Sequence, residues 1–349
     1  MVWMPEKRLL AIIVAAAVFG GCAAPGPSKE EIVGYKRPFG PRAPWNVPVK
    51  GLERHPGSER YGKLLWDEGA GERPGNFNLN VGGEYTYPVY YVSDATDTYT
   101  VEAKWVSNIS GEKIPWNPEW KPNGGTDGQI ILLDEKRGIE IDFWQAEVDR
   151  ERKIVRATNC YRIGRGEKLD SATGNYWKKE NGFSPARGIG IQYLAMLGRP
   201  EEIALGAIEH ALSMPVVNTS GKESIPPATK IEHPDHPDGV PEGMRFALDV
   251  TDGEIEAWLA ALPPEVTPEI RHFARIVAVA LRDYGWFTTD TSGGAHLQFE
   301  ARESAAGMWE ALGIIDVESK ETGKTYPRDL LDGLVTRDNI YVLVGSDNY

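Results

Sequence analysis

Apolar and polar residues alternate most clearly in residues 128–147. Two alternating runs flank a short turn at 134–138, and this pattern predicts an antiparallel hairpin. Because strand side chains alternate between two faces, the second run places apolar residues on one face and Glu140, Asp142 and Trp144 on the other. Two carboxylates followed by an indole indicate the wall of a cleft, but a solvated face with one amphipathic Trp would give the same pattern.

Shorter runs of the same kind extend the strand prediction over much of the chain. Single strands are expected at residues 85–93, 98–106, 153–163, 243–250 and 340–344, and residues 208–214 are expected to form either a buried strand or a second turn. A second hairpin is expected from residues 286–290 and 296–301, joined by a Gly-rich turn at 292–294. Residues 114–127, with three Pro and two Trp, predict a long aromatic surface loop, a kind of segment that often carries binding residues.

Helical spacing is strongest after Thr267, where the repeating apolar positions are Ile270, Phe273, Val277 and Leu281. Other helices are expected at residues 199–206, 251–262 and 329–334. Many short strands with few helices, and no internal repeat, favour a mainly β fold. We therefore predict a single β-rich globular domain over residues 41–349, built as a jelly-roll-like β-sandwich with several peripheral helices.

The N-terminus predicts export. Lys7 and Arg8 precede an apolar run at residues 9–19 that suits the core of a signal peptide and is too short to span a bilayer comfortably. Small residues directly before Cys22 resemble the lipobox of bacterial lipoproteins, which implies lipid attachment at that Cys. We expect a signal peptide at 1–21, a lipid-anchored flexible tether at 22–40 and attachment to the bacterial cell envelope, with plain secretion as the alternative.

The net charge limits which partners are expected, and the cysteine content limits which disulfides can form. Acidic residues outnumber basic ones by 51 to 38, and the net charge of −13 argues against nucleic acid as a partner. We expect membrane contact only through the N-terminal lipid. The second of the two Cys is Cys160, so lipidation of Cys22 leaves no intramolecular disulfide. Eleven Trp and fourteen Tyr suit stacking on sugar rings, and equally the filling of a large β core.

Glu140 and Asp142 are the first candidate catalytic residues. Two positions apart on a strand, their Cα atoms should lie roughly 6.5–7 Å apart. Their carboxyl groups could then reach the separations used in glycoside hydrolysis, about 5–5.5 Å for retention and 6.5–9.5 Å for inversion. Trp144, on the same face, would serve as a stacking platform for the sugar.

Further candidate residues lie on other segments of the chain. His210 could act as a general base if it shared one cleft with Asp142, Asp290 or Glu202, but a lone His in an apolar stretch is often a satisfied core residue. We assign Asp290 to the catalytic residues as an orienting group, and Glu202 to substrate binding. Arg199 and Arg245 could bind a carboxylated or sulfated sugar through paired hydrogen bonds, or could form structural ion pairs.

The sequence offers little for a metal or a cofactor. Residues 233–238 contain two His and two Asp, but Pro interrupts their spacing, so we predict a solvated loop, no metal site and no cofactor. Gly-x-Ser-x-Gly, Walker, His-Glu-x-x-His and dinucleotide motifs are absent from the sequence. Their absence counts against esterases, NTPases and common metalloproteases.

Residues 199–212, RPEEIALGAIEHAL, resemble the block R-x-x-E-I-x-x-G-x-I-x-H-A-L of a family of secreted bacterial proteins abundant in actinomycetes. Further ordered matches extend the resemblance over residues 44–300. It implies one secreted globular unit and no particular reaction. This chain has Lys230 where the family tends to have His after Pro-Ala-Thr, so a mechanism that needs that His is in doubt.

A weaker resemblance concerns the predicted strand itself. Glu140-Ile-Asp142-Phe is similar to the Glu-x-Asp-x-x-Glu strand of laminarinase-like glycoside hydrolases, which have concanavalin-type jelly rolls. Trp144 and Gln145 stand where the third acid should be, so the motif is incomplete in this chain.

These features together predict an exported polysaccharide-active enzyme of the cell envelope, a glycoside hydrolase that uses carboxylate acid/base chemistry. One alternative is a non-catalytic glycan-binding surface lipoprotein, which needs the aromatic residues but no clustered titratable groups. A second is a polysaccharide lyase with His210 as its base. A polysaccharide or glycan is the expected partner in all three.

Overall fold

A computed structural model describes residues 39–41, 43–164, 186–232, 236–305 and 307–346. The predicted signal peptide, Cys22 and nearly all of the predicted tether lie outside the described residues, as does His233. Among the helices that are described, none combines the length and the apolarity that crossing a bilayer would require.

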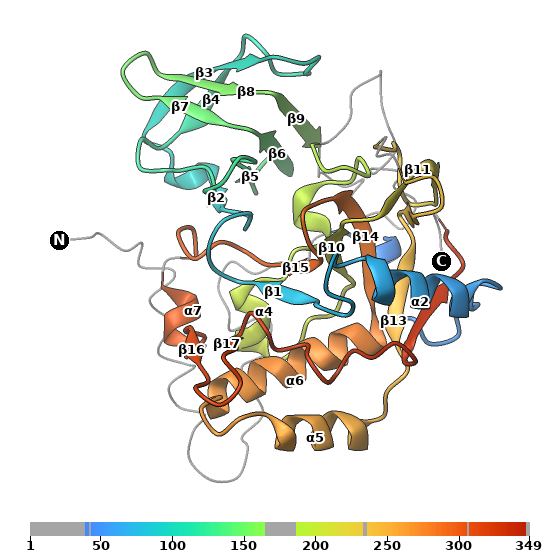
Figure 1. Cartoon of the computed structure of the whole chain (residues 1–349). Coiled ribbons are helices and arrows are strands. Elements are labelled where there is room, and N and C mark those ends of the chain that lie inside the picture. The colour runs from blue at the N-terminus through green and yellow to red at the C-terminus, as the bar shows by residue number, and fades with distance from the viewer. Residues whose placement is uncertain (1–38, 42, 165–185, 233–235, 306, 347–349) are drawn as a thin grey trace.

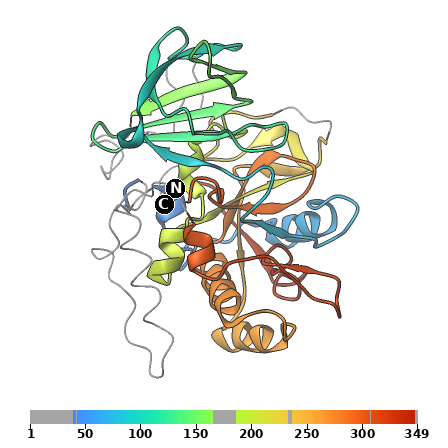
Figure 2. The ribbon, with the colours of Figure 1, turned by 90° about the vertical axis from the view of Figure 1, so that its left-hand side faces the viewer.

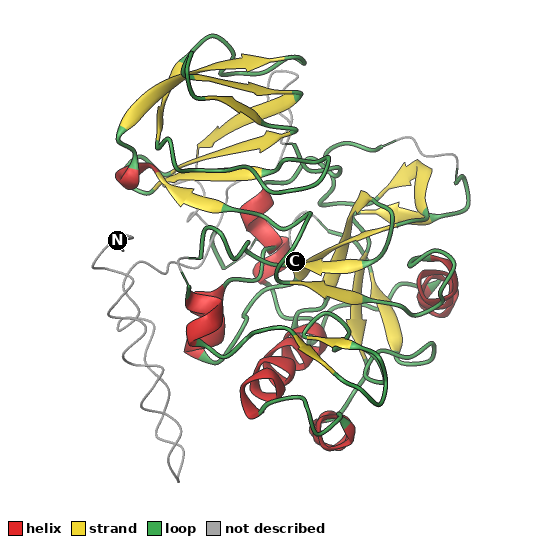
Figure 3. Cartoon of the chain, turned by 60° about the vertical axis from the view of Figure 1, so that its left-hand side comes forward, coloured by secondary structure: helices red, strands yellow, loops and turns green. Residues whose placement is uncertain are grey.

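The chain folds into two regions, one above the other in Figure 1. We call residues 89–164 the β region, and all other described residues the mixed region. The β region consists almost entirely of strands, and the longer helices gather in the mixed region (Figure 3). More residues lie in strands than in helices, so the mainly β prediction is confirmed at that level.

The β region contains two four-stranded sheets. The expected hairpin at 128–147 is confirmed, because β5 and β6 pair antiparallel. Their inner side chains share one hydrophobic core, which joins residues such as Ile141 and Phe143 to Tyr99 and Val155 of the facing sheet. In spatial order, the first sheet is β2 (Val89–Tyr91), β5 (Ile130–Asp134), β6 (Ile139–Trp144) and β9 (Asn159–Gly164); the second is β4 (Lys113–Trp116), β3 (Asp97–Ala103), β8 (Ile154–Ala157) and β7 (Glu147–Asp149).

Two strand predictions in this region need correction. The strand expected at 153–163 is two strands, β8 and β9, which belong to different sheets. The apolar pattern continues across Thr158, where the chain passes from one sheet to the other, so alternation alone does not reveal the break. The strand expected at 85–93 is shortened to β2, because Tyr85 has a φ of 64° and the chain turns into a 3₁₀ helix, η2 (Val92–Asp94).

The mixed region is built on a third four-stranded sheet, in the order β10 (Leu212–Val216), β14 (Trp286–Thr291), β13 (Arg245–Leu248) and β18 (Ile340–Leu343). Helix α6 (Pro268–Asp283) and helix α5 (Asp252–Ala261) pack on it as the sequence predicts, each with a Thr that caps its N-terminus. The apolar positions of α6 are buried in the largest core cluster. Figure 2 shows these helices below the sheet, on the side away from the β region.

The remaining elements contain the other errors of prediction. The hairpin expected at 286–301 is wrong, because β15 (His296–Gln298) pairs with β1 (Asn78–Asn80) and not with β14. The helix α2 (Ser58–Glu68) was not expected, and residues 329–334 form turns rather than a helix. The smaller elements are α4 (Pro200–Leu205), α7 (Met308–Ala311), β11 (Thr219–Ser224), β12 (Val240–Glu242), β16 (Val317–Glu318) and β17 (Thr325–Tyr326), with 3₁₀ helices η1 (Pro44–Asn46) and η3 (Tyr193–Met196).

The two regions meet through an apolar cluster of their own. Val89, Ile131 and Leu133 extend from β2 and β5 toward the mixed region and pack against Tyr193 and Leu194 of η3. The β region therefore covers η3. This contact buries Glu140 and Asp142 of β6 and leaves Trp144 partly exposed.

Candidate functional site

A cavity of about 580 Å³ lies between the two regions. Its β-region wall includes Trp105, Asp127, Gln129 and Trp144. Its other wall, from the mixed region, includes residues 290–294 at the end of β14, together with Lys230, Glu232 and His296. The volume is in the range of small-molecule sites, so the cavity is our candidate functional site.

Asp290 and Glu232 form a carboxyl pair in this cavity. Asp290 is at the end of β14, and its Oδ2 accepts a hydrogen bond from the Gly188 N–H (3.0 Å). The N–H of Thr291 donates to Glu232 Oε2 (2.7 Å) and to Asp290 Oδ1 (3.1 Å), which draws the two carboxyl groups together. The two side chains are also hydrogen-bonded to each other, which requires one of them to carry a proton.

The environment of the pair separates the two pKa values. Burial raises the pKa of Asp290 well above its usual range, and the charge of Glu232 raises it further. Burial also acts to raise the pKa of Glu232, but hydrogen bonds from Asp290 and Thr291 outweigh it, and that pKa is lowered. Of the two groups, Asp290 therefore holds a shared proton more strongly than Glu232 does.

Glu242 adjoins the pair, and His296 lines the same cavity. Glu242, fully buried in β12, accepts a hydrogen bond from the Glu232 N–H (2.9 Å), and burial raises its pKa to about 7. Burial lowers the pKa of His296 to about 4, so its imidazole is neutral at physiological pH. Lys230 also lines the cavity, at the position where the resembling family tends to have His.

The opposite wall is aromatic and partly exposed. Trp105 is 53% exposed, and its ring lies 5.5 Å from that of Trp144, tilted by 44°. The indole N–H of Trp144 donates to Asp127 Oδ1 (3.3 Å). Such a wall can stack on the apolar face of a ring-shaped ligand.

A buried Arg packs against the two Tyr rings that line the cavity between its two walls. Arg187 is fully buried and donates to the Tyr193 carbonyl oxygen (2.5 Å) and to Gln298 Oε1 (2.8 Å). Its guanidinium carbon lies 5.6 Å from the ring centre of Tyr87 and 5.4 Å from that of Tyr193. It therefore fixes the two Tyr rings that line the cavity between its walls.

Glu140 and Asp142, the first candidates from sequence, lie outside this cavity. Both are completely buried, and they bind the backbone at the start of η3: Tyr193 N–H donates to Asp142 Oδ2 (3.1 Å) and Leu194 N–H to Glu140 Oε1 (3.0 Å). Burial raises the pKa of Asp142, and the charge of Glu140 adds to that increase. The face that alternation suggested as a cleft wall is covered by η3, and the pair joins the two regions.

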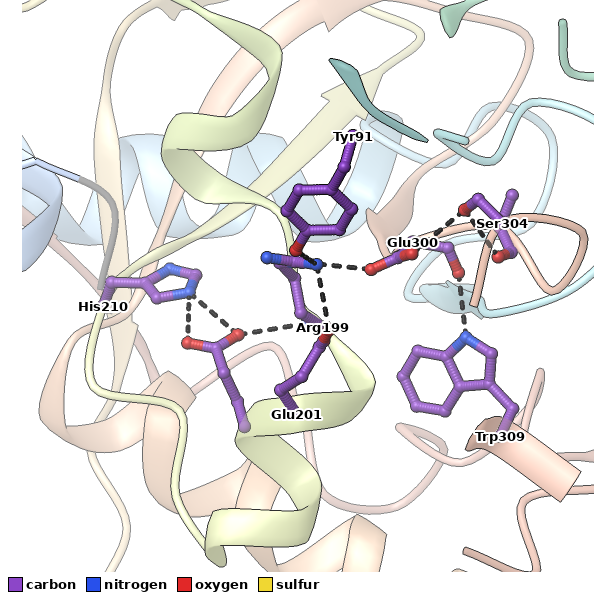
Figure 4. A network of polar contacts seen from close by, with 9 residues as sticks. Tyr91, Arg199, Glu201, His210, Glu300, Ser304 and Trp309 are labelled. Atoms are coloured by element: carbon purple, nitrogen blue, oxygen red, sulfur yellow. Dashed lines mark hydrogen bonds and ion pairs between the residues drawn. The ribbon is translucent and has the colours of Figure 1, made fainter. Parts of the chain in front are cut away.

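His210, Arg199 and Glu202 belong to a buried polar network, shown in Figure 4. His210 Nε2 lies 3.0 Å from Glu202 Oε1, and Arg199 Nε donates to Glu300 Oε2 (3.0 Å). Arg199 Nη2 also donates to the hydroxyl of Tyr91 in β2 (3.0 Å), so the network connects the two regions.

The network lies at the other end of the sheet from Asp290. Leu212 is opposite Trp286 in the parallel pairing of β10 with β14, and His210 precedes Leu212. Asp290 is four residues beyond Trp286, about 13 Å further along the strand. Arg245 is buried as well, and donates to the carbonyl oxygens of Pro44, Val47 and Tyr284. The structure therefore does not bring His210, Glu202, Arg199 or Arg245 to the cavity.

Of the residues proposed from sequence, Asp290 and Trp144 line the cavity. Glu232, Asp127 and Gln129 were not proposed. The available signal was the aromatic loop at 114–127, which ends in Asp127 and was expected to carry binding residues. Nothing in the sequence around Glu232 indicates that it meets Asp290, because that contact depends on the tertiary fold.

No three His, Cys, Asp or Glu side chains in the described part of the chain are grouped so that they could hold a metal ion. Comparisons with known proteins leave the resemblances untested: no family model matches the chain, and no curated protein or solved structure does. The two resemblances found in the sequence therefore stay predictions.

Proposed function

We propose that this protein is an exported polysaccharide-active hydrolase whose proton-transfer centre is the Asp290–Glu232 pair. The observation that carries the proposal is a carboxyl pair with opposite pKa shifts, facing an aromatic wall across one cavity. Pairs of titratable groups whose environments separate their pKa values are typical of acid/base sites.

In the proposed reaction, Asp290 donates its proton to the glycosidic oxygen as the bond to the anomeric carbon breaks. Water adds to the anomeric carbon, and the proton that the water loses returns to the carboxyl pair. The carboxylate of Glu232 accepts the proton of Asp290 in a hydrogen bond and so holds it in place before transfer. The N–H groups of Gly188 and Thr291 stabilise the charge that Asp290 gains.

The pair cannot play the two separate carboxylate roles of the usual glycosidases. Groups hydrogen-bonded to each other are closer than the roughly 5–5.5 Å of retaining enzymes or the 6.5–9.5 Å of inverting ones. We therefore propose that Asp290 and Glu232 act on the same side of the glycosidic bond, as one unit that shares a proton.

Export and lipid attachment at Cys22 remain part of the proposal, as does a location at the cell envelope. A sandwich-like arrangement of the two β-region sheets is also proposed, on the support of their common core. Two strand pairs in these sheets, β2 with β5 and β3 with β8, are parallel, which is unlike a jelly roll.

A second candidate function is glycan binding without catalysis. The exposed ring of Trp105 beside Trp144 favours it, because such a surface needs no titratable partner. The lyase alternative loses support, because His210 is 1% exposed and bound to Glu202, away from the cavity.

A polysaccharide panel tests the proposal. We would incubate neutral, amino-substituted and acidic polysaccharides with wild type and Glu232→Gln, and measure new reducing ends. We expect cleavage of at least one neutral substrate, and a loss of at least about 100-fold in the variant. Thermal unfolding of both proteins controls for folding. Binding without cleavage across the panel would support the second candidate, and neither binding nor cleavage would reject both.

A further inference from the structure

We infer that Asp127, Gln129 and Trp144 form a subsite for an uncharged sugar unit that presents hydroxyl groups. The inference rests on the proposed function in that it takes the cavity ligand to be a carbohydrate. It adds the substrate class and assigns recognition to the β-region wall, opposite the carboxyl pair.

The three side chains hold one another in place. Asp127 Oδ1 accepts from Trp144 Nε1 (3.3 Å), and Asp127 Oδ2 accepts from Gln129 Nε2 (2.9 Å). The backbone of the same loop is tied to the end of β6, because Gln145 N–H donates to the Asp127 carbonyl oxygen (2.6 Å). The subsite is thus fixed before any ligand arrives, which lowers the entropy cost of binding.

Gln129 provides the observation that points to a ligand. Its NH₂ group is turned toward Asp127, to which it donates. That orientation leaves Gln129 Oε1, on a side chain that is 3% exposed, without a hydrogen-bond partner among the described residues. Leaving a buried acceptor unpaired is unfavourable, and a ligand that donates to it would recover that free energy.

The polar atoms that Asp127 and Gln129 present on the β-region wall are mainly hydrogen-bond acceptors. The carboxylate oxygens of Asp127 each keep capacity for another donor, and Gln129 contributes a carbonyl oxygen. Hydroxyl groups of a sugar can satisfy both. A uronate or sulfate would instead face Asp127 and the ionised Glu232, with Lys230 as the single Lys or Arg among the described residues that line the cavity.

The Arg residues that could have favoured an acidic sugar are committed elsewhere. Arg199 is paired with Glu201 and Glu300, and Arg245 with backbone carbonyl oxygens. The charge of the cavity therefore favours a neutral unit over an anionic one.

The subsite is close enough to the carboxyl pair to hold one end of the same ligand. Trp144, oriented by its bond to Asp127, offers its ring for stacking, with Trp105 beside it. Tyr87 lies between the two sides: burial raises its pKa, and the charges of both Asp290 and Asp127 add to that increase against the effect of Arg187. A ligand that stacks on Trp144 would then reach toward Asp290.

The test uses the full chain with Asp290→Asn, so that binding is measured without turnover. Isothermal titration would compare neutral hexasaccharides of glucose, mannose, galactose and xylose with a hexamer of galacturonate. We expect at least one neutral hexamer to bind and the galacturonate hexamer to bind at least about tenfold more weakly, which corresponds to 1.4 kcal/mol.

Two variants in that background then examine the subsite. Gln129→Met keeps the size of the side chain and removes its amide, and Asp127→Asn removes the charge. Each should weaken neutral binding at least about tenfold, while Asp134→Asn, at the last residue of β5 and outside the cavity, should not. Unfolding curves show whether each variant is folded, and either variant alone suffices if the other is not.

Neutral binding that both variants leave unchanged would overturn the inference, as would preferred binding of galacturonate or no binding at all. The two proposals fail separately. If the neutral hexamer binds through Gln129 but wild type never cleaves it, hydrolysis is rejected and the subsite stands. If wild type cleaves it and Gln129→Met leaves KM unchanged, the subsite is rejected and hydrolysis stands.

Discussion

The protein contains two carboxyl pairs with similar chemistry and different surroundings. Glu140 and Asp142 are neighbours on one strand, completely buried, and bound to the backbone of η3. Glu232 and Asp290 come from distant segments and meet at the surface of a cavity. In each pair, burial and a like charge raise the pKa of the Asp.

The difference between the pairs lies in what ligands can reach. A perturbed pKa indicates a functional site only when the group is accessible, because buried structural networks also perturb pKa values. The first pair fixes the contact between the two regions, and the second is free to exchange protons with a bound molecule.

The largest expected difference is in stability. Replacing both Glu140 and Asp142 with Ala leaves the N–H groups of Tyr193 and Leu194 buried without acceptors, and should lower the free energy of unfolding by about 4 kcal/mol. Replacing Glu232 and Asp290 with Ala should lower the free energy of unfolding by about 1 kcal/mol or less. Water in the cavity can then hydrate the N–H groups of Gly188 and Thr291 that lose their acceptors. Urea unfolding of both double variants measures this. Equal losses of unfolding free energy in the two double variants would contradict the distinction between a structural pair and an accessible pair.

A smaller effect concerns the third carboxyl group beside the second pair. The pKa of Glu242 is about 7 in the folded protein, above its usual 4.5, so the folded state binds more protons between these values. Its contribution to stability is therefore complete below about pH 4.5 and is lost as the pH rises through 7. Urea unfolding at pH 5 and pH 8 should show wild type losing up to about 3 kcal/mol more than Glu242→Gln. An equal loss of unfolding free energy in wild type and Glu242→Gln would contradict the raised pKa of Glu242.

The smallest predicted effect tests whether the exact placement of the Asp290 carboxyl group matters for the rate. A Cβ at Gly188 would lie 2.6 Å from Asp290 Oδ1 and 3.0 Å from its Cα, so Gly188→Ala must displace Asp290 without changing its chemistry. We expect about a tenfold loss of kcat, since small misplacements of a reacting group are costly. Gly253→Ala in α5 is the matched control, because a Cβ there would make only an ordinary contact, 3.8 Å from Thr251 Oγ1. Unchanged kcat in Gly188→Ala would mean that the placement of Asp290 is not critical.

Local patterns predicted much of the fold. The hairpin of β5 and β6, the helix α6 with its Thr cap, and the helix α5 follow from alternation, helical spacing and capping, all of which act between residues close in sequence. The pairing of β15 with β1 could not be predicted in this way. It depends on where a turn sends the chain, and apolar periodicity carries no information about distant partners.

The candidate site shows the same limit more sharply. The spacing of Glu140 and Asp142 correctly indicates that they are neighbours, but not that η3 covers them. Asp290 and Trp144 were proposed for their residue types, and the structure places both at the cavity. Glu232 was missed because its relation to Asp290 exists only in three dimensions.

The most direct test of the central claim compares one variant from each pair in the same assay. Initial rates on the polysaccharide that wild type cleaves best would be measured for Asp290→Asn and Asp142→Asn, normalised to folded protein. The account predicts a loss of at least about 100-fold for Asp290→Asn and less than about threefold for Asp142→Asn. A large loss in Asp142→Asn with nearly full activity in Asp290→Asn would contradict it.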